Sequence, residues 1–244
     1  MTVPVASNPQ AAARAALRSR RFDHVFFSAI SVLMAAGVFA GFSQTYLRRI
    51  SAGTASPLIH VHGAVFAIWM LLFVLQSVLV ATRRTRLHRQ VGMAGVFFAV
   101  VMLVIGTVTG VIAARHGYNG PFPSDAKPLS FLLSSPIRDM LVFGGLTGAA
   151  IVLRRDVESH KRLMVMATLG GLAPAGFVRI AGIAAGVALV SGLLLAGPVY
   201  DWLTQRRIYA AYVWGIAVTF LSSGLFALLA ETETWQAFAR TLVE

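Results

Sequence analysis

Hydrophobic and polar positions follow one another along this chain in long blocks, with apolar runs separated by short polar segments. An α-helix needs about 20 predominantly apolar residues to cross the roughly 30 Å hydrocarbon core of a bilayer. Seven runs reach that length or come close to it: Val25–Leu47, Leu58–Ala81, Val91–Ala114, Ile137–Leu153, Leu163–Val178, Ile183–Leu203 and Ile208–Leu229. The pattern predicts an all-α fold, a polytopic membrane helix bundle of about seven transmembrane helices.

The fifth and sixth runs are separated by little more than Arg179, so a bundle of six spans with one broken helix is the alternative. A single helix over residues 163–203 would be about 60 Å long at 1.5 Å per residue, twice the hydrocarbon thickness. Two spans therefore fit this segment better than one.

Composition supports a membrane environment. Of the 244 residues, 57% are hydrophobic and 12% charged, and the mean hydropathy is +0.74. Soluble domains carry about 25% charged residues, so this chain cannot cover a water-facing surface and the lipid bilayer is its expected solvent. The chain has no cysteine, which excludes disulfides, thiolate metal sites and cysteine nucleophiles.

The net charge of +12 is spread in a way that predicts topology and gives no indication of nucleic-acid binding. Basic residues form short clusters between the apolar runs, as they do on the cytoplasmic side of membrane proteins. With the N-terminus inside, fourteen of the 21 Lys and Arg residues lie in inner segments and seven in outer ones. The sequence therefore predicts a multi-pass protein of a bacterial inner (cytoplasmic) membrane, with its N-terminus inside and its C-terminus outside.

The domain organisation predicted from these runs is simple. Residues 1–24 form a basic, disordered cytoplasmic arm, residues 25–230 the helix bundle, and residues 231–244 a short outer tail. The one long loop is outer and runs from Arg115 to Pro136, with several Gly and Pro residues. We find no internal repeat and no phosphate-binding, hydrolase, metalloprotease or calcium-binding motif, so the sequence assigns no reaction and no catalytic residue.

Polar residues at the outer edges of the spans form the first candidate site. His62, Trp69 and Gln76 are seven residues apart and share one helix face, whereas His60 points to nearly the opposite side. A face this polar is expected to turn toward the bundle, because polar groups in contact with lipid are costly. The predicted ligand-binding pocket opens outward under the long loop and is lined by Tyr46, His62, Trp69, Gln76, Asp139 and Arg179.

We make two further predictions for residues of this pocket. Asp139 and Arg179 are expected to form an ion pair in the pocket wall, and His62 with Asp139 is the candidate metal site. The competing interpretation is purely structural: a network of hydrogen bonds and a salt bridge that hold the spans together.

The second candidate site is at the inner edge. His88 and His160 each stand in a basic loop just before an apolar run, and Arg89 and Arg162 lie close to them in the sequence. Small-residue faces follow both histidines, with Gly92, Gly95 and Ala99 after the first and Ala167, Gly171 and Ala175 after the second. Two histidines at one depth suit the axial positions of a haem b, with the arginines near its propionates. The structural alternative is that both histidines anchor the chain at the membrane edge.

These motifs carry a family resemblance. The segments LHRQVGMAG, HVHGAVFAIWMLLFVLQ and SHKRLMVMATLGGLAPAGFVRI resemble those of a group of uncharacterised bacterial multi-pass membrane proteins, over about residues 25–240. The resemblance implies a membrane helix bundle and no established activity. A more distant similarity is to two-haem b-type membrane cytochromes, which share the His-Arg-x-x-Gly step of His88, Arg89 and Gly92. Those proteins pair histidines on both membrane sides, whereas here the fourth span offers Asp139 in place of an outer histidine.

Three functions remain open at this point. The first is a membrane protein that binds a small ligand, metal or cofactor in the outer pocket. The second is a b-type haem electron carrier that uses the inner histidines. The third is an accessory or structural subunit of a larger membrane complex, or of a homo-oligomer, with no chemistry of its own.

Overall fold

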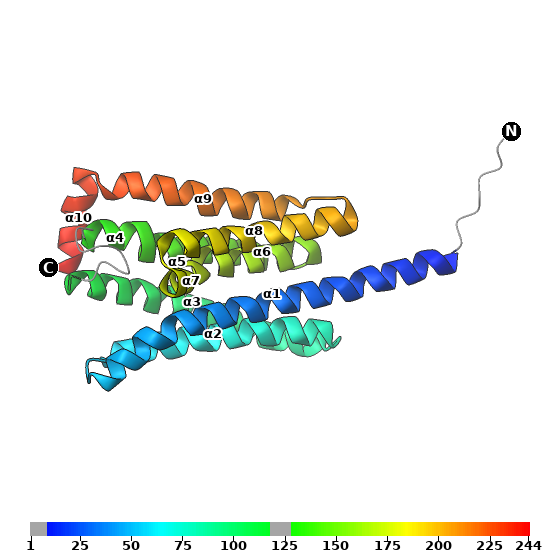
Figure 1. Cartoon of the computed structure of the whole chain (residues 1–244), viewed down its shortest axis with the longest axis horizontal. Coiled ribbons are helices and arrows are strands. Elements are labelled where there is room, and N and C mark those ends of the chain that lie inside the picture. The colour runs from blue at the N-terminus through cyan, green and yellow to red at the C-terminus, as the bar shows by residue number, and fades with distance from the viewer. Residues whose placement is uncertain (1–8, 118–127) are drawn as a thin grey trace.

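The computed structural model describes residues 9–117 and 128–244, and that part of the chain is built from helices without strands (Figure 1). The helices are α1 (Pro9–Ser51), α2 (Pro57–Ala81), α3 (Thr85–Arg115), α4 (Pro128–Leu132), the π-helical turn η1 (Leu133–Ile137), α5 (Arg138–Val152), α6 (Val157–Gly171), α7 (Ala173–Ala181), α8 (Ile183–Gln205), α9 (Ala210–Ala230) and α10 (Glu233–Val243). Six segments within them are long and apolar enough to span a membrane, and α6 with α7 forms a bent pair that makes a seventh. The predicted all-α polytopic membrane helix bundle is confirmed.

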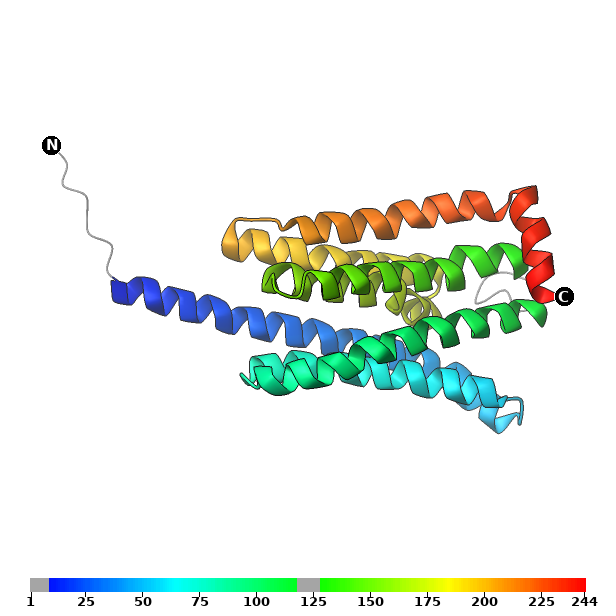
Figure 2. The same ribbon diagram turned by 180° about the vertical axis from the view of Figure 1, so that it is seen from behind.

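The two ends of the described chain lie at opposite ends of the bundle (Figure 1). The α2–α3, α5–α6 and α8–α9 connections lie near the end where α1 enters, and the view from behind gives the same arrangement (Figure 2). We call this the inner end and the opposite one the outer end. An odd number of crossings is needed to bring the chain from one end to the other, which agrees with seven spans when α6 and α7 count as one.

The fifth span is broken at Leu172, where α6 meets α7 at an angle of 47°. Pro174 opens α7, and because proline has no backbone N–H it cannot continue the hydrogen bonds of α6. Gly171 lets the break approach α5, since a Cβ there would lie 2.7 Å from the Asp139 carbonyl oxygen. Gly182, at φ +80°, then turns the chain back into α8 with a conformation that favours glycine.

The fourth span begins nine residues earlier than the sequence predicts, at Pro128 rather than Ile137. Pro136 lies inside this span. Proline has no backbone N–H to donate, and the chain forms the π-helical turn η1 around the interrupted hydrogen-bond pattern. The expected loop from Arg115 to Pro136 is therefore wrong in its second part, and residues 118–127, which were expected to roof the pocket, lie outside the described residues. Asp139 is eleven residues into the span, about 16 Å from its outer start, and so lies near its middle.

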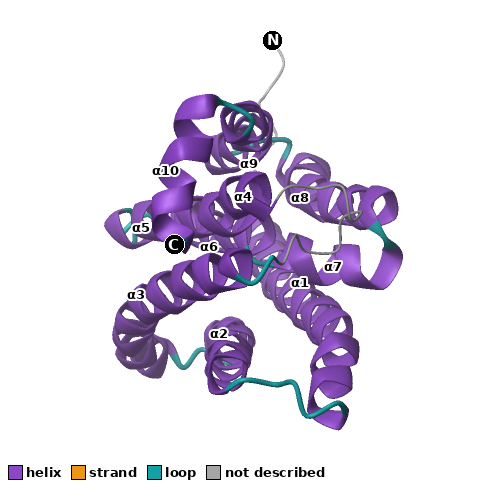
Figure 3. Ribbon diagram, turned by 90° about the vertical axis from the view of Figure 1, so that its left-hand side faces the viewer, coloured by secondary structure: helices purple, strands orange, loops and turns teal. Residues whose placement is uncertain are grey.

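The first and last segments are also helical, although the sequence predicts a disordered arm before the first span. α1 begins at Pro9 and runs without a break into the first span, because the alanine- and arginine-rich residues before Phe22 are strong helix formers. At the other end of the chain, α10 crosses the outer end of the bundle, as the view from that side shows (Figure 3). The Trp235 indole N–H of α10 donates to the Leu129 carbonyl.

Apolar side chains fill the interior and also cover much of the surface. Met34, Met102, Phe143 and Met166 are fully buried, whereas Leu228 is 75% exposed. α6 lies near the centre of the bundle and is buried along most of its length (Figure 3). The apolar surface is what distinguishes this bundle from a soluble protein, and it suits contact with lipid, where exposed apolar side chains carry no cost.

Candidate functional site

The outer-edge residues do not gather into one pocket. The Tyr46 hydroxyl lies 2.7 Å from His60 Nδ1 on the exposed side of α1 and α2. His62, two residues on, turns inward and stacks on Phe66 with ring centroids 4.3 Å apart. Its Nδ1 atom is buried without a hydrogen-bond partner among the described residues.

The stripe of His62, Trp69 and Gln76 faces the bundle, as the spacing predicts, but it extends from the outer half of the bundle to the inner histidines. Trp69 is 3% exposed and packs edge-on against Phe143. Gln76 lies fourteen residues from His62, about 21 Å along α2, and reaches the inner histidine His88. The assignment of Gln76 to the outer pocket is therefore wrong, because a shared helix face does not imply a shared depth.

Asp139 pairs with its sequence neighbour, and the expected Asp139–Arg179 ion pair is wrong. The Arg138 Nη1 atom lies 2.6 Å from Asp139 Oδ1, and the Ser135 hydroxyl donates to Oδ2. Arg138 also donates to the Thr219 carbonyl and to the Ser222 hydroxyl of α9. Each of these groups is satisfied, so the pair ties α5 to α9 near the middle of the bundle. No group of three His, Asp or Glu side chains suited to a metal occurs among the described residues.

Arg179 holds α7 against α1 at the outer side. Its guanidinium lies over the Phe42 ring, 4.4 Å from the centroid, and donates to the Ala175 carbonyl at 2.7 Å. These contacts agree with the close packing of α1 and α7, where a Cβ on Gly41 would lie 2.1 Å from the Gly176 carbonyl oxygen.

The two inner histidines do converge. His88, in the first turn of α3, and His160, in the first turn of α6, have ring centroids 6.5 Å apart with nearly perpendicular planes. The expected approach of these residues, which are far apart in sequence, is confirmed. We call His88 and His160 the inner histidine pair.

Both rings are held by their Nδ1 atoms. His160 Nδ1 lies 2.8 Å from the Ala150 carbonyl, which can only accept, so this nitrogen carries the proton. The Gln76 amide, in the orientation that satisfies both of its ends, donates to His88 Nδ1 and accepts from the Gly92 N–H at 2.9 Å. In both histidines Nε2 is the ring nitrogen left for another partner.

The spacing of the rings excludes a direct hydrogen bond between them, since two imidazoles joined by a bond of about 2.9 Å have centroids about 5 Å apart. The observed 6.5 Å, with nearly perpendicular planes, is the geometry of an edge-to-face contact. It is also close to the roughly 6.4 Å between two imidazoles that face one metal atom across bonds of 2.0–2.1 Å.

The small-residue faces after the two histidines serve helix packing, which is one of the two roles expected for them. A Cβ on Gly95 would meet Leu72, and one on Gly171 would meet α5 backbone. On α5, a Cβ on Gly144 would lie 3.0 Å from the Leu103 side chain of α3, whereas one on Gly148 would meet nothing within 4 Å because Gly148 is exposed.

Only one of the two arginines expected beside a haem is placed for that role. Arg89 is exposed one residue after His88, and its Nε donates to the Thr85 carbonyl at 3.4 Å. Arg162 has a fully buried side chain that is turned away from the pair toward α8 and α9. Its predicted position near the propionates is wrong.

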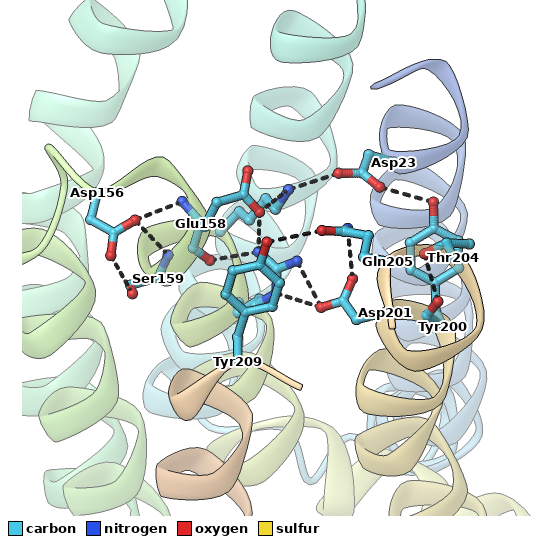
Figure 4. Close-up of polar contacts among 11 residues, drawn as sticks. Asp23, Asp156, Glu158, Ser159, Tyr200, Asp201, Thr204, Gln205 and Tyr209 are labelled. Carbon is cyan, nitrogen blue, oxygen red and sulfur yellow. Dashed lines mark hydrogen bonds and ion pairs between the residues drawn. The ribbon is translucent and has the colours of Figure 1, made fainter. Parts of the chain in front are cut away.

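Arg162 belongs to a cluster of charged and polar residues that joins four helices at the inner end (Figure 4). Its guanidinium contacts Asp201 Oδ2 at 2.7 Å and Glu158, and lies 3.6 Å from the Tyr209 ring centroid. We name this set the inner ionic cluster: Asp23, Glu158, Lys161, Arg162, Tyr200, Asp201, Gln205 and Tyr209.

The remaining bonds of the cluster bring α1 into contact with α6 and α8. Lys161 Nζ lies 2.9 Å from Asp23 and 2.8 Å from Glu158, and the Tyr200 hydroxyl donates to Asp23 at 2.9 Å. The sequence analysis did not single out these carboxylates. A usable signal was present, because Asp23 and Asp201 are acidic residues at the inner ends of two apolar runs, where carboxylates are rare unless paired.

α6 itself begins at an acidic N-cap outside the spans. Asp156 accepts from the Glu158 and Ser159 backbone N–H groups and from the Ser159 hydroxyl at 2.6 Å. The Ser159 bonds hold the pKa of the Asp156 carboxyl below its usual value. This cap fixes the turn that carries His160, Lys161 and Arg162.

Comparison with known proteins adds no assignment to this geometry. No family model matches the chain, and no curated protein or solved structure matches it. The functional argument therefore rests on the residues of the chain itself.

Proposed function

We propose that this protein is a haem-binding electron carrier of the bacterial inner membrane, with His88 and His160 as the axial ligands of one haem iron. The observation that carries the proposal is the 6.5 Å separation of the two imidazole rings, which suits two ligands on opposite sides of one iron atom. Haem iron supplies one-electron transfer, and the residues described here would bind and orient the group.

Two features of the surroundings support a metal between these rings. Histidines that bind metals usually donate their second ring N–H to a carbonyl, a carboxylate or water, as His160 does to Ala150, whereas His88 accepts a hydrogen bond from Gln76 at that nitrogen. No third His, Asp or Glu completes a metal site among the described residues, and a haem iron needs none because the macrocycle supplies four ligands. The exposed Arg89 suits a propionate.

An absorption spectrum of the purified full-length protein tests the proposal. We expect a Soret band that sharpens and shifts on reduction, in wild type and in His60→Ala, and its loss in His88→Ala and His160→Ala. His60 is a matched control because it is a membrane-edge histidine on the opposite side of α2 from the stripe. A protein that stays colourless after incubation with haemin, with correct folding shown by its thermal transition, would contradict the proposal.

A second candidate function is binding of a small lipid-soluble molecule in the outer half. His62 Nδ1 and Trp69 Nε1 are buried without hydrogen-bond partners among the described residues. Leaving such a group unsatisfied costs about 1–3 kcal/mol, and a carbonyl oxygen on a ligand would offset that cost. This candidate predicts that His62→Phe weakens quenching of Trp69 fluorescence by a short-chain quinone while His60→Phe does not. Equal quenching in both variants would exclude it.

A further inference from the structure

An open hollow at the outer end of the bundle is lined by two arginines. It lies where α1 ends and the chain turns into α2 (Figure 1), has a volume of about 310 Å³, and is lined by Thr45, Arg48, Arg49 and Thr54. The Thr54 backbone N–H and hydroxyl both donate to the Arg49 carbonyl, at 2.9 and 3.3 Å. Gly53, at φ +64°, supplies the left-handed conformation of this turn. Local hydrogen bonds therefore set the shape of the hollow.

The two guanidinium groups are the donors that the hollow offers to a ligand. Arg48 Nε donates to the Gln44 carbonyl at 3.1 Å, which orients the group and leaves its terminal NH2 groups as donors. Neither arginine forms an ion pair within the part of the chain that the structure describes. The Thr45 and Thr54 hydroxyls both donate to backbone carbonyls, so the arginines alone would bind an anion here.

The surrounding chain supplies no negative charge. No Asp or Glu occurs in the sequence between Asp23 and Asp125, so the outer half of α1 and the whole of α2 and α3 carry no carboxylate side chain. Arginine in the last turn of a helix is favoured by the helix dipole, which accounts for one positive charge there better than for two in a row. The counter-charge of Arg48 and Arg49 therefore comes from outside this part of the chain.

The hollow lies at the level of the lipid headgroups. Arg48 directly follows the apolar run Val25–Leu47, and the side chains of Leu47 and Ile50 on either side of the two arginines are exposed. Exposed apolar side chains of a membrane helix contact acyl chains, so the arginines lie at the boundary between acyl chains and water. The anion that a membrane presents at this boundary is the phosphate of its lipids.

We propose that Arg48 and Arg49 bind the phosphodiester group of one phospholipid of the outer leaflet. A guanidinium can engage two phosphate oxygens through parallel N–H···O bonds, whereas a lysine acts as a point charge. Successive residues of a helix point about 100° apart, so the two arginines approach the phosphate from two sides. The site lies at the opposite end of the bundle from the inner histidine pair and is independent of haem binding.

Native mass spectrometry of the full-length protein in an uncharged detergent, titrated with phosphatidylglycerol, tests the site. We expect wild type and Arg240→Gln to retain one lipid equally well. Arg240 is the matched control because it is an exposed arginine of α10 at the same end of the bundle. We expect Arg48→Gln and Arg49→Gln each to weaken this binding roughly tenfold, as loss of a charged hydrogen bond does, and Arg48→Lys to weaken it less.

Two competing ligands identify the source of the phosphate. Diacylglycerol, which has the acyl chains without the phosphate, should not displace the lipid, and inorganic phosphate should do so only at much higher concentration because it lacks the chains. Equal retention in wild type, Arg48→Gln and Arg49→Gln, with unchanged thermal transitions showing that all three fold, would overturn the site. Displacement by inorganic phosphate at the concentration of the lipid would overturn the phospholipid as its occupant.

Discussion

Two buried arginines show how this chain places charge inside a membrane. Arg138, near the middle of the bundle, and Arg162, at the inner end, each have a carboxylate within 2.7 Å and further bonds to neighbouring helices. A buried charge whose partner is removed is strongly unfavourable, whereas the intact pair contributes little net stability. Their main effect is to specify which helices meet.

The pair of Arg162 and Asp201 gives the first prediction. Asp201→Asn leaves the fully buried guanidinium without its main carboxylate, so we expect a loss of about 3–5 kcal/mol in unfolding free energy. Thr204→Ala, an exposed position on the same turn of α8, should change it little. Denaturation of the detergent-solubilised protein measures both. A change below about 1 kcal/mol in Asp201→Asn would show that Glu158 alone compensates Arg162.

For single residues, the sequence predicted part of the candidate site. One histidine in each of two basic loops was enough to expect that His88 and His160 lie at one depth, and they converge. Gln76 was placed at the wrong end because a repeat of seven residues keeps the helix face and moves about 10 Å along the axis. Arg162 was misplaced because it lies two residues after His160 on the same helix. Side chains two residues apart point in different directions, and Arg162 points to α8.

Among the helices, the first turn of α6 connects the two inner features. His160 faces α5 and α3, while Lys161 and Arg162 face α1, α8 and α9. The Asp156 cap holds this turn from outside the membrane. The position of the histidine pair therefore depends on how well the start of α6 is ordered.

The cap gives a pH prediction. The pKa of Asp156 is lowered in the folded protein by its bonds to Ser159, so its stabilising contribution is complete above the usual carboxyl value of 3.8. That contribution is lost as the pH falls through the lowered pKa. Asp156→Asn should keep the cap and remove this acid-dependent loss, whereas Asp156→Ala should lower stability at neutral pH as well. Thermal unfolding between pH 3 and 7, monitored by circular dichroism, distinguishes the three proteins, and identical acid limbs would refute the role of the cap.

The packing of α7 on α1 gives another prediction. A Cβ at Gly41 would lie 2.1 Å from the backbone of Gly176, so the helices must separate in Gly41→Ala. We expect a loss of roughly 1–3 kcal/mol, as in other overpacked sites. Gly192→Ala in α8 is the matched control, because its Cβ would meet nothing within 4 Å. Equal thermal stability of the two variants would contradict the close approach.

The helix boundaries show where sequence patterns are insufficient. The apolar runs identified every span, but the fourth was predicted too short because Pro136 looked like the end of a loop. A proline can be accommodated inside a span by a π-helical turn, and here α3 and α9 pack against that turn. Tertiary packing decided this boundary, and single-sequence periodicity does not report it.

For the whole molecule, topology is the property that follows most directly from both sequence and structure. The inner-end connections carry the clusters of Lys and Arg, and the two ends of the chain lie at opposite ends of the bundle. We expect alkaline phosphatase fused after Glu244 to be active, since that enzyme requires the periplasm, and a fusion in the α2–α3 turn to be inactive. The reverse pattern would invert the orientation, and activity at neither site would favour six spans.

The inner ionic cluster also constrains the order in which the protein can be completed. Asp23 and its partner Tyr200 are 177 residues apart, so the first helix must wait for the eighth before their hydrogen bond can form. During synthesis the charges of α1 and α6 therefore remain without these partners while most of the chain is being inserted. Their place at the membrane edge lets water solvate them in the meantime. This contact can close only after α8 has been inserted, and a chain truncated before α8 should be recognised by the cell as incomplete and degraded.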